Sequence, residues 1–379
     1  MRIGLVCPYN IFSGGGVQEQ VLTLQKTFEK RGHYVRILTP LPREYEGQVP
    51  KEIITLGVSM NTTAFAGTNW QWSVSVDTDA IDEVFEREKF DLLHFHEPWV
   101  PVWGRQLLMR SKSANVATMH ARFLDTLTAK TVSNVFIPYT KPQIKYFDAF
   151  TAVSVPAMEY LLSLKKVPIT VVPNGIDFKK YSRRPARAIR NPGMKTILYI
   201  GRLEERKGVK FLLKAFSEIA HRNEYIQLLI AGQGPDSQKL RRYVATNEIP
   251  RVTFLGFISE DEKIHHLHRA DVFCSPAYFG ESFGVVLLEA MAADLPVVAG
   301  DNPGYQSVMV DRGALSLVNP QDTIDFARRL ELMTFDEGLR RLWSKWANKR
   351  VKEFDFPKVA DQYMKVYEDA IKKSKQRKT

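Results

Sequence analysis

The stretch GESFGVVLLEAMAA carries two carboxylates whose spacing could serve a binding site. Glu281 and Glu289 are eight residues apart, about two turns of a helix, so both side chains can project toward one side. A helix that begins near Ser282 places Glu281 at its N-terminal mouth, where the backbone N–H groups of Phe283 and Gly284 can face an anion. Glu289 stands in the middle of an apolar helix, and a buried carboxylate needs a partner. The stretch predicts one carboxylate for sugar hydroxyls and one for ribose hydroxyls, with phosphates between them; the alternative is a capped core helix.

A second polar segment, GRLEERKG, stands between two apolar runs. Arg202 directly follows the first run, and Lys207 precedes Gly208 and the start of the next helix. Arginine binds phosphate oxygens as a planar fork, whereas lysine supplies a compact charge. The segment therefore predicts a diphosphate site, with a solvated surface loop as the alternative.

A glycine cluster follows the first apolar run of the chain. Gly14, Gly15 and Gly16 let the backbone approach a ligand closely, and the free N–H groups of the helix that follows suit a phosphate. The cluster is neither a dinucleotide fingerprint nor a Walker A motif. His120 follows another apolar run, and its position at a strand end makes it a candidate, although a lone histidine is more often structural.

The elements that must position these residues alternate between short apolar runs and amphipathic stretches, which is typical of βαβ units. Val17, Val21, Leu24 and Phe28 recur at helical spacing, and Gly32 ends that helix. The pattern restarts at residue 195, so we expect an α/β chain of two doubly wound domains, with ligands at the carboxyl ends of the strands. The strands are expected at Arg2–Cys7, Val35–Thr39, Asp91–His96, Val116–Met119, Phe150–Val153, Lys195–Ile200, Gln227–Ala231, Val252–Leu255, Val272–Ser275 and Leu295–Ala299. A helix is expected at Val209–Ala220, and a last one from Pro357 to Lys372.

Composition limits the function further. The chain has 379 residues, 44% of them hydrophobic, and no apolar run long enough to span a bilayer, so we expect a cytoplasmic protein. Cys7 and Cys274 lie in apolar runs and are expected to be buried free thiols. The net charge of +11 favours anionic partners, but no nucleic-acid-binding module accompanies it, so nucleic acid is not expected as a partner.

The segments GGGVQ, VPNGID, GRLEERKG and ESFGVVLLEAMAADLPVVAG together resemble the family 4 glycosyltransferases, and the similarity runs the whole chain. The resemblance implies a GT-B fold: two Rossmann-like domains facing a cleft, residues 1–176 on the acceptor side and 177–355 on the donor side, with a C-terminal helix, 356–379, crossing back to the first domain. The segments MRIGLVCPY, HFHEPWVP and ATMH are most similar to the bacterial phosphatidylinositol mannosyltransferases, which use GDP-mannose and retain the anomeric configuration.

Carried over residue by residue, the resemblance assigns roles. Gly15 and Gly16 would approach the donor phosphate, and Arg202 and Lys207 would neutralise the leaving diphosphate. Of the remaining motif residues, Glu281 would hold the sugar hydroxyls, Glu289 the ribose, and His120 the reacting face of the sugar, with Ser282, Phe283, Gly284 and Ile258 beside the donor and Tyr9, Gln18 and Asn69 beside the acceptor. The family needs neither metal nor cofactor, and Asp77-Thr78-Asp79 is expected to start a helix instead of binding a metal.

The nucleotide is predicted from the loop FISEDEK, which matches the base-binding loop of the mannosyltransferases. Glu260 stands where that loop has an acid, and Lys263 keeps its lysine. A carboxylate and an ammonium complement the edge of guanine, which has donors at N1 and N2 and an acceptor at O6. GDP is therefore expected over UDP or ADP; the alternative is a helix-start acid beside a surface lysine.

The acceptor side departs from the family pattern. The segment NWQWSVSV holds no cation, the helix expected after it is acidic, and Asp125 stands where the family has a lysine. Phosphatidylinositol as the acceptor is therefore in doubt. The apolar side chains that could instead form a lipid entrance, or belong to the core, are Trp70, Trp72, Phe123, Leu127, Phe136 and Ile137.

The expected partners are a nucleotide-sugar donor, a lipid-linked acceptor and, through a basic tail, an anionic membrane surface on which the protein would lie peripherally. The tail residues concerned are Lys372, Lys373, Lys375, Arg377 and Lys378. Two alternatives remain: a transferase using a UDP- or ADP-sugar and another acceptor, and a basic binding protein with a vestigial sugar-nucleotide site.

Overall fold

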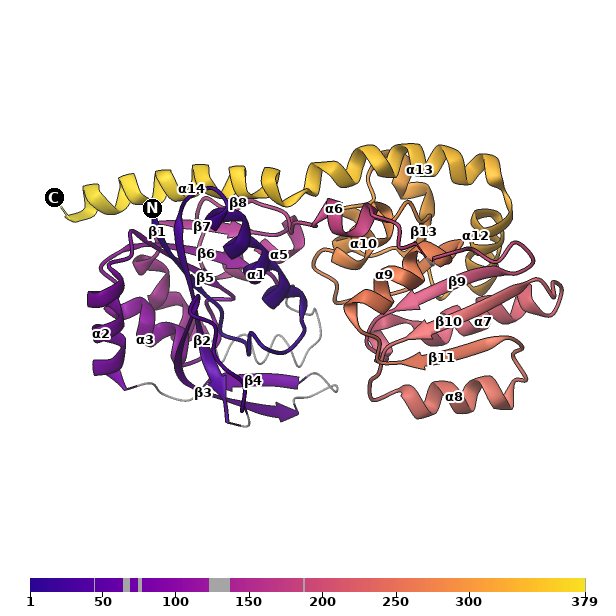
Figure 1. The fold of residues 1–379 in the computed structure, drawn as a ribbon, viewed down its shortest axis with the longest axis horizontal. Helices are drawn as coiled ribbons and strands as arrows, with labels where there is room; N and C mark the ends of the chain where they lie inside the picture. The colour runs from indigo at the N-terminus through magenta and orange to yellow at the C-terminus, as the bar shows by residue number, and fades with distance from the viewer. Residues whose placement is uncertain (44, 64–68, 74–76, 123–136, 187, 379) are drawn as a thin grey trace. The chain divides into compact units, whose positions relative to one another are not determined.

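The computed structural model describes residues 1–43, 45–63, 69–73, 77–122, 137–186 and 188–378. The chain divides into two compact units: unit 1 comprises Met1–Gly175 and Phe356–Thr379, and unit 2 comprises Ile176–Asp355 (Figure 1). Each unit has its own sheet flanked by helices, which confirms the expected pair of α/β domains.

Unit 1 is built on an eight-stranded sheet with the order β4-β3-β2-β1-β5-β6-β7-β8. Only β4 is antiparallel among these pairings. The strands are β1 (Arg2–Val6), β2 (Tyr34–Pro42), β3 (Ile53–Thr63), β4 (Asn69–Ser73), β5 (Leu92–His96), β6 (Ala114–Met119), β7 (Ala149–Ala152) and β8 (Thr170–Val171). The five strands expected in this half are confirmed to within a few residues, whereas β3, β4 and β8 were not predicted.

The helices of unit 1 begin and end where the local sequence dictates. Helix α1 buries Val21, Leu24 and Phe28, and the chain after it turns at Gly32, whose φ of 81° lies in the left-handed region. The N-cap of α2 is Asp77, whose side chain accepts a hydrogen bond from the Asp79 N–H, so this acidic pair starts a helix as expected. The helical elements are α1 (Gly16–Glu29), α2 (Thr78–Glu88), α3 (Trp103–Arg110), η2 (Lys141–Tyr146), α5 (Val155–Leu164) and α14 (Phe356–Lys378).

Helix α14 returns to unit 1 after the chain has completed unit 2, and it packs on α1 and β6 (Figure 1). Its apolar residues recur every three or four positions and join the core of β1, β2 and α1. They are Phe356, Val359, Ala360, Tyr363, Val366, Tyr367 and Ala370. The helix continues past the predicted end at Lys372, because the basic tail contains neither glycine nor proline. None of the helices that the structure describes is both long and apolar enough to cross a bilayer.

Unit 2 holds a six-stranded parallel sheet with the order β11-β10-β9-β12-β13-β14. Its strands are β9 (Lys195–Ile200), β10 (Ile226–Ala231), β11 (Val252–Gly256), β12 (Val272–Ser275), β13 (Val297–Gly300) and β14 (Leu317–Val318). Its helical elements are α6 (Phe178–Ser182), η3 (Glu205–Lys207), α7 (Val209–Ala220), α8 (Ser237–Thr246), α9 (Glu260–Arg269), α10 (Val285–Ala292), α11 (Pro303–Gln306), η4 (Asp311–Ser316), α12 (Thr323–Phe335), α13 (Glu337–Val351) and η5 (Lys352–Phe354). The predicted β9, β12 and α7 have the observed bounds.

Parallel pairing explains how residues far apart in sequence come together within each unit. The loops after β1, β5 and β6 carry the glycine cluster, Glu97 and His120 to one edge of the first sheet. The segments that follow β9, β11 and β12 carry Lys207, Lys263 and Glu281 to one edge of the second sheet. These are the carboxyl edges, where open α/β sheets bind ligands.

Candidate functional site

Glu281 lies in the turn after β12 and binds two cations through one oxygen. Its Oε1 is 2.6 Å from Lys207 Nζ and 2.8 Å from Arg206 Nη1. Arg206 also pairs with the buried Glu204 at 2.6 Å. Burial would raise the pKa of Glu281, but Lys207 and Arg206 lower it below its ordinary value. The result is an ionised carboxylate held in place between two cations.

The turn between β9 and α7 brings Lys207 to this point. The short helix η3 ends at Gly208, whose φ is 69°, and a Cβ there would lie 2.2 Å from the carbonyl oxygen of Pro276. Only glycine lets the two turns approach this closely. Arg202, on the same turn, has its Nε 3.8 Å from Glu204 Oε2 and keeps 46% of its side chain exposed.

The helix after Glu281 starts later than the sequence indicates. Helix α10 begins at Val285, with Gly284 as its N-cap, so a start near Ser282 is wrong. Gly284 has a φ of 117°, and a Cβ there would meet the ring of Tyr305 at 2.7 Å, so a left-handed residue breaks the helix before this point. Gly284, as the N-cap, and the first residues of α10 carry the orphan N–H groups of this helix start, whereas Phe283 precedes the N-cap. Glu281 is outside the helix, so two helical turns do not bring the two glutamates to one side, contrary to the prediction.

A second cluster in unit 2 joins Glu289 to the loop after β11. Lys263 Nζ is 2.8 Å from Glu289 Oε1 and 2.8 Å from Glu260 Oε2. The hydroxyl of Tyr181 lies 2.5 Å from Glu260 Oε1 and 3.0 Å from Glu289 Oε1. Lys180 adds a contact of 2.9 Å to Glu260. Two residues expected to read the base and one expected to hold the ribose are thus one connected group.

Local structure and charge define this second cluster. Ser259 and Glu262 form a capping box at the start of α9, so Glu260 and Lys263 lie in its first turn. Burial would raise the pKa of Glu260, but Lys263 and Tyr181 bring it down to about 2. Burial raises the pKa of Glu289, and Lys263 offsets only part of that rise. Ile258, which is expected beside the donor, immediately precedes the capping box and is half-buried.

In unit 1, His120 is buried at the end of β6 and belongs to a group of side chains. Its Nε2 lies 2.8 Å from Nδ1 of His96, and its ring stacks on that of His96. The carboxylate of Glu97 accepts hydrogen bonds from the backbone N–H groups of His120 and Ala121. Burial lowers the pKa of His120 to about 4, although a hydrogen bond to Asn174 opposes the shift. The imidazole is therefore neutral near pH 7, and burial raises the pKa of Glu97 to about 7.

The remaining predicted residues of unit 1 lie near the start of α1 or outside the described side chains. Gly15 is the N-cap of α1 and Gly16 its first residue; both are exposed, and a Cβ at Gly16 would meet nothing. Gln18 is buried, and its Nε2 donates to the Asn10 carbonyl at 3.3 Å. Burial, with the nearby Glu97, raises the pKa of the Tyr9 hydroxyl. Residues predicted for the acceptor side that lie outside the described residues or side chains are Asn69, Trp70, Trp72, Phe123, Asp125, Leu127 and Phe136.

The structure adds residues that the motifs did not indicate. Arg206, Glu204 and Tyr181 complete the clusters of unit 2, and His96 and Glu97 complete that of unit 1. Arg206 lies within the segment GRLEERKG and Glu97 within HFHEPWVP, so their positions offered a signal, whereas Tyr181 follows VPNGID in an unremarkable polar stretch. Cys7 and Cys274 are buried free thiols as expected, and burial raises the pKa of Cys7 to about 12.

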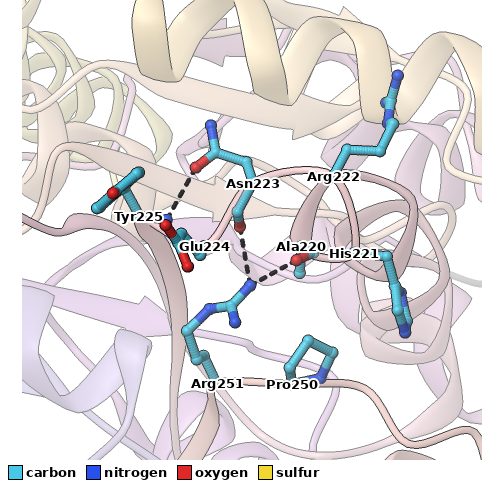
Figure 2. Close-up of a pocket in the computed structure, with 8 residues that line it drawn as sticks. All are labelled: Ala220, His221, Arg222, Asn223, Glu224, Tyr225, Pro250 and Arg251. Atoms are coloured by element: carbon cyan, nitrogen blue, oxygen red, sulfur yellow. Dashed lines mark hydrogen bonds between the residues drawn. The ribbon is translucent and has the colours of Figure 1, made fainter.

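Figure 2 shows a surface depression in unit 2 that lies away from these clusters, with a volume of about 620 Å³. Its residues precede β10 and β11, so it lies at the amino edge of the sheet. Arg251 donates hydrogen bonds there to the carbonyls of Ala220 and Asn223 (Figure 2), and it also donates one to the carbonyl of Ile226. The bond to Ala220 satisfies a carbonyl at the C-terminal end of α7.

Comparison with known proteins gives consistent matches. Residues 14–180 match the family model "Glycosyltransferase Family 4", and residues 183–350 match "Glycosyl transferases group 1". A phosphatidyl-myo-inositol mannosyltransferase of Mycobacterium leprae is 32% identical over 97% of this chain and 96% of its own. A more distant relative, the alpha-monoglucosyldiacylglycerol synthase of Streptococcus pneumoniae, is 26% identical over 83% of this chain and 75% of its own. Among solved structures, sucrose-phosphate synthase from Thermosynechococcus elongatus superposes with a TM-score of 0.78 at 22% identity, covering 97% of this chain and 98% of that one.

Proposed function

Because this chain belongs to the family 4 glycosyltransferases of the GT-B fold, we propose that it transfers mannose from GDP-mannose to a lipid-linked acceptor with retention of anomeric configuration. Transferase activity follows from the family. The choice of mannose is supported by relatives that are named mannosyltransferases and match nearly the whole chain.

The observation that carries the proposal is the Glu281–Lys207–Arg206 cluster at the carboxyl edge of the second sheet. When a glycosidic bond to a nucleoside diphosphate breaks, negative charge develops on the leaving phosphate oxygens. Preorganised cations stabilise that charge more than they stabilise the ground state. Lys207 is already held in place by Glu281, and Arg202 extends from the same turn with much of its side chain exposed. These two cations supply the charge, and we expect neither a metal nor a cofactor to be required.

The sugar and the nucleoside would be held on either side of this diphosphate. Glu281 is ionised, so its carboxylate can accept hydrogen bonds from sugar hydroxyls. Glu289 would take the ribose hydroxyls, and Glu260 with Lys263 would take the edge of guanine. In the structure Lys263 contacts both Glu260 and Glu289. The base and the ribose would therefore replace contacts that already hold these side chains in place.

His120 would contribute to the sugar from unit 1. Because its imidazole is neutral near pH 7, it can form a hydrogen bond without adding a positive charge near the anomeric carbon. Gly15 and Gly16 would leave room for the donor phosphates, since the position of Gly16 is open.

Thermal unfolding with a panel of GDP, UDP, ADP and their sugars tests the donor. A ligand that binds only the folded state stabilises it by RT ln(1 + [L]/Kd), so at equal concentrations the tighter ligand raises the melting temperature more. We expect the largest shift with GDP and GDP-mannose at equal concentrations. Equal shifts, or a larger shift with UDP, would contradict the assignment of the nucleotide.

A second candidate function has the same donor and a neutral lipid acceptor. The exposed face of α2 carries Asp79, Glu83 and Glu86, with Arg87 as its only exposed cation within the helix, and an acidic face disfavours an inositol phosphate. The relative from Streptococcus pneumoniae is named for a glucosyldiacylglycerol product, which supports this alternative. Assays with vesicles that contain phosphatidylinositol or diacylglycerol as the acceptor distinguish the two candidates. In either case we expect the reaction at the cytoplasmic face of the membrane.

A further inference from the structure

Tyr181 is a buried residue that the motifs did not indicate, and its helix and a backbone hydrogen bond hold it in place. It lies in α6, whose N-cap is Asp177, and only 2% of it is exposed. Its backbone carbonyl accepts a hydrogen bond of 2.8 Å from Nε2 of the buried His268. His268 belongs to α9, the same helix that carries Glu260 and Lys263. The tyrosine is thus tied to the element whose side chains its hydroxyl contacts.

The Tyr181 hydroxyl and the Lys263 ammonium contact the same two carboxylates. The phenol oxygen is 2.5 Å from Glu260 and 3.0 Å from Glu289, and Lys263 Nζ is 2.8 Å from each of them. Lys263 Nζ also lies 5.3 Å from the centre of the Tyr181 ring. The four groups form a closed ring in which each carboxylate contacts the hydroxyl and the ammonium, and Glu260 has Lys180 as a further cationic partner at 2.9 Å.

Two carboxylates this close repel each other when both are ionised, and Lys263 alone would draw both onto a single point. The Tyr181 hydroxyl, opposite the ammonium, has a single proton and donates to one carboxylate at a time. It contacts Glu260 at 2.5 Å and Glu289 at 3.0 Å, and this position between the two restricts where their oxygens lie. The contacts of Glu289 with Tyr181 and Lys263 both fall on Oε1. This arrangement fixes the position of the Glu289 carboxylate before a nucleotide binds. Less conformational entropy of that side chain is then lost on binding.

We propose that Tyr181 is a positioning residue for the nucleoside half of the donor, acting through Glu289 and Glu260 instead of touching the nucleotide. The inference rests on the proposed function and deepens it, because it assigns the ordering of the base and ribose carboxylates to one hydroxyl. The diphosphate half has its own cluster: Lys207 and Arg206, from η3, bind Glu281. The hydroxyl of Tyr181 should therefore affect nucleoside recognition and leave diphosphate binding unchanged.

Tyr181→Phe removes the hydroxyl and keeps the ring. Hydrogen bonds to charged groups contribute enough that we expect the Kd of GDP to rise about 10-fold and the KM of GDP-mannose to rise with it, while kcat changes little. Inorganic pyrophosphate, which contains only the diphosphate chemistry, should bind with an unchanged Kd. Calorimetric titration of both ligands gives these values. The matched control is Tyr160→Phe, which removes another buried tyrosine hydroxyl, bonded to Thr140 in unit 1.

A double-mutant cycle in a Glu260→Ala/Glu289→Ala background tests whether the hydroxyl acts through the two carboxylates, because alanine leaves it no side-chain acceptor at either position. If it does, adding Tyr181→Phe to that background raises the Kd of GDP by less than about twofold, because coupled residues are not additive. An additive effect, an unchanged Kd in Tyr181→Phe, or an equal loss of pyrophosphate binding overturns the proposal.

The same titrations separate this inference from the proposed function. If the wild-type protein prefers UDP or ADP, the assignment of GDP fails and the Tyr181 comparison is made with the preferred nucleotide. If wild-type protein binds pyrophosphate but no nucleoside diphosphate, both proposals fail.

Discussion

A buried carboxylate stays ionised at Glu281 because two cations meet at one of its oxygens. Lys207 and Arg206 both lie within 2.8 Å of Oε1, and only 12% of the glutamate side chain is exposed. Arg206 is in turn held by Glu204, which is buried beside it. Removing one member of such a chain leaves the others without compensation, so single substitutions here should affect more than one contact.

At the scale of single residues, we expect Arg202→Ala and Lys207→Ala each to reduce turnover about 10²- to 10³-fold, the usual loss for one preorganised charge stabiliser. Arg202→Ala should leave the fold stable, because nearly half of that side chain is exposed. Lys207→Ala should also lower the melting temperature by a few degrees, since Glu281 loses a partner. Steady-state kinetics and thermal unfolding of both variants measure these effects. Near wild-type rates in both would exclude this site.

The close approach of two turns, one before α7 and one after β12, sets the geometry around the proposed diphosphate site more than the position of any helix does. Gly208 lets the turn before α7 meet the carbonyl of Pro276, and Pro276 follows β12 on the way to Glu281. Lys207 comes from one of these turns and Glu281 from the other. Their contact therefore depends on a backbone distance that any side chain at Gly208 would increase.

At the scale of elements, we expect Gly208→Ala to destabilise the protein by about 2–4 kcal/mol and to reduce kcat/KM at least 10-fold. The left-handed conformation costs alanine roughly 1–2 kcal/mol, and the clash with Pro276 adds to this. Gly32→Ala is the matched control, because Gly32 has a φ of 81° and a Cβ there would meet nothing within 4 Å. Denaturant unfolding and initial rates compare the two. Equal losses in both variants would show that the contact with Pro276 has no role.

For the whole molecule, the excess positive charge is partly compensated within the fold. The net charge is +11, yet Arg377 of the tail pairs with Asp148 at 3.4 Å, and Lys372 lies 3.9 Å from Asp369. The acidic face of α2 belongs to the same unit as the tail. Attraction to an anionic surface is thus weaker than a count of tail cations implies.

We nevertheless expect the full chain to bind anionic vesicles at low salt and to lose that binding at high salt. Each cation near such a surface contributes about 1 kcal/mol, and the Debye length falls from about 10 Å at 0.1 M salt to about 3 Å at 1 M. Co-sedimentation with and without residues 372–379 measures the contribution of the tail. A variant with Lys372, Lys373 and Lys375 changed to glutamine removes charge and keeps the helix, so it controls for lost packing. If the full chain does not bind anionic vesicles at low salt, a soluble acceptor becomes the better hypothesis.

The sequence alone determined those features that depend on local pattern. Alternating apolar runs and amphipathic stretches predict two α/β domains, and the spacing of Val359, Tyr363 and Val366 predicts α14, because burial of one face leaves a periodic trace. Motifs at strand ends predict which loops carry chemistry, since parallel strands place those loops at one edge. The short β8 and the antiparallel β4 have no comparable periodic pattern in the sequence, so they were not predicted.

Only the tertiary structure decided how the side chains of the site are paired. The start of α10 depends on the ring of Tyr305 packing against Gly284, a contact 21 residues away along the chain that no local pattern records. The pairing of Glu289 with Lys263 joins α10 to α9, and Tyr181 reaches both from α6. These contacts follow from how three helices pack on one sheet, so the residues that hold the site in place became visible only once the chain was folded.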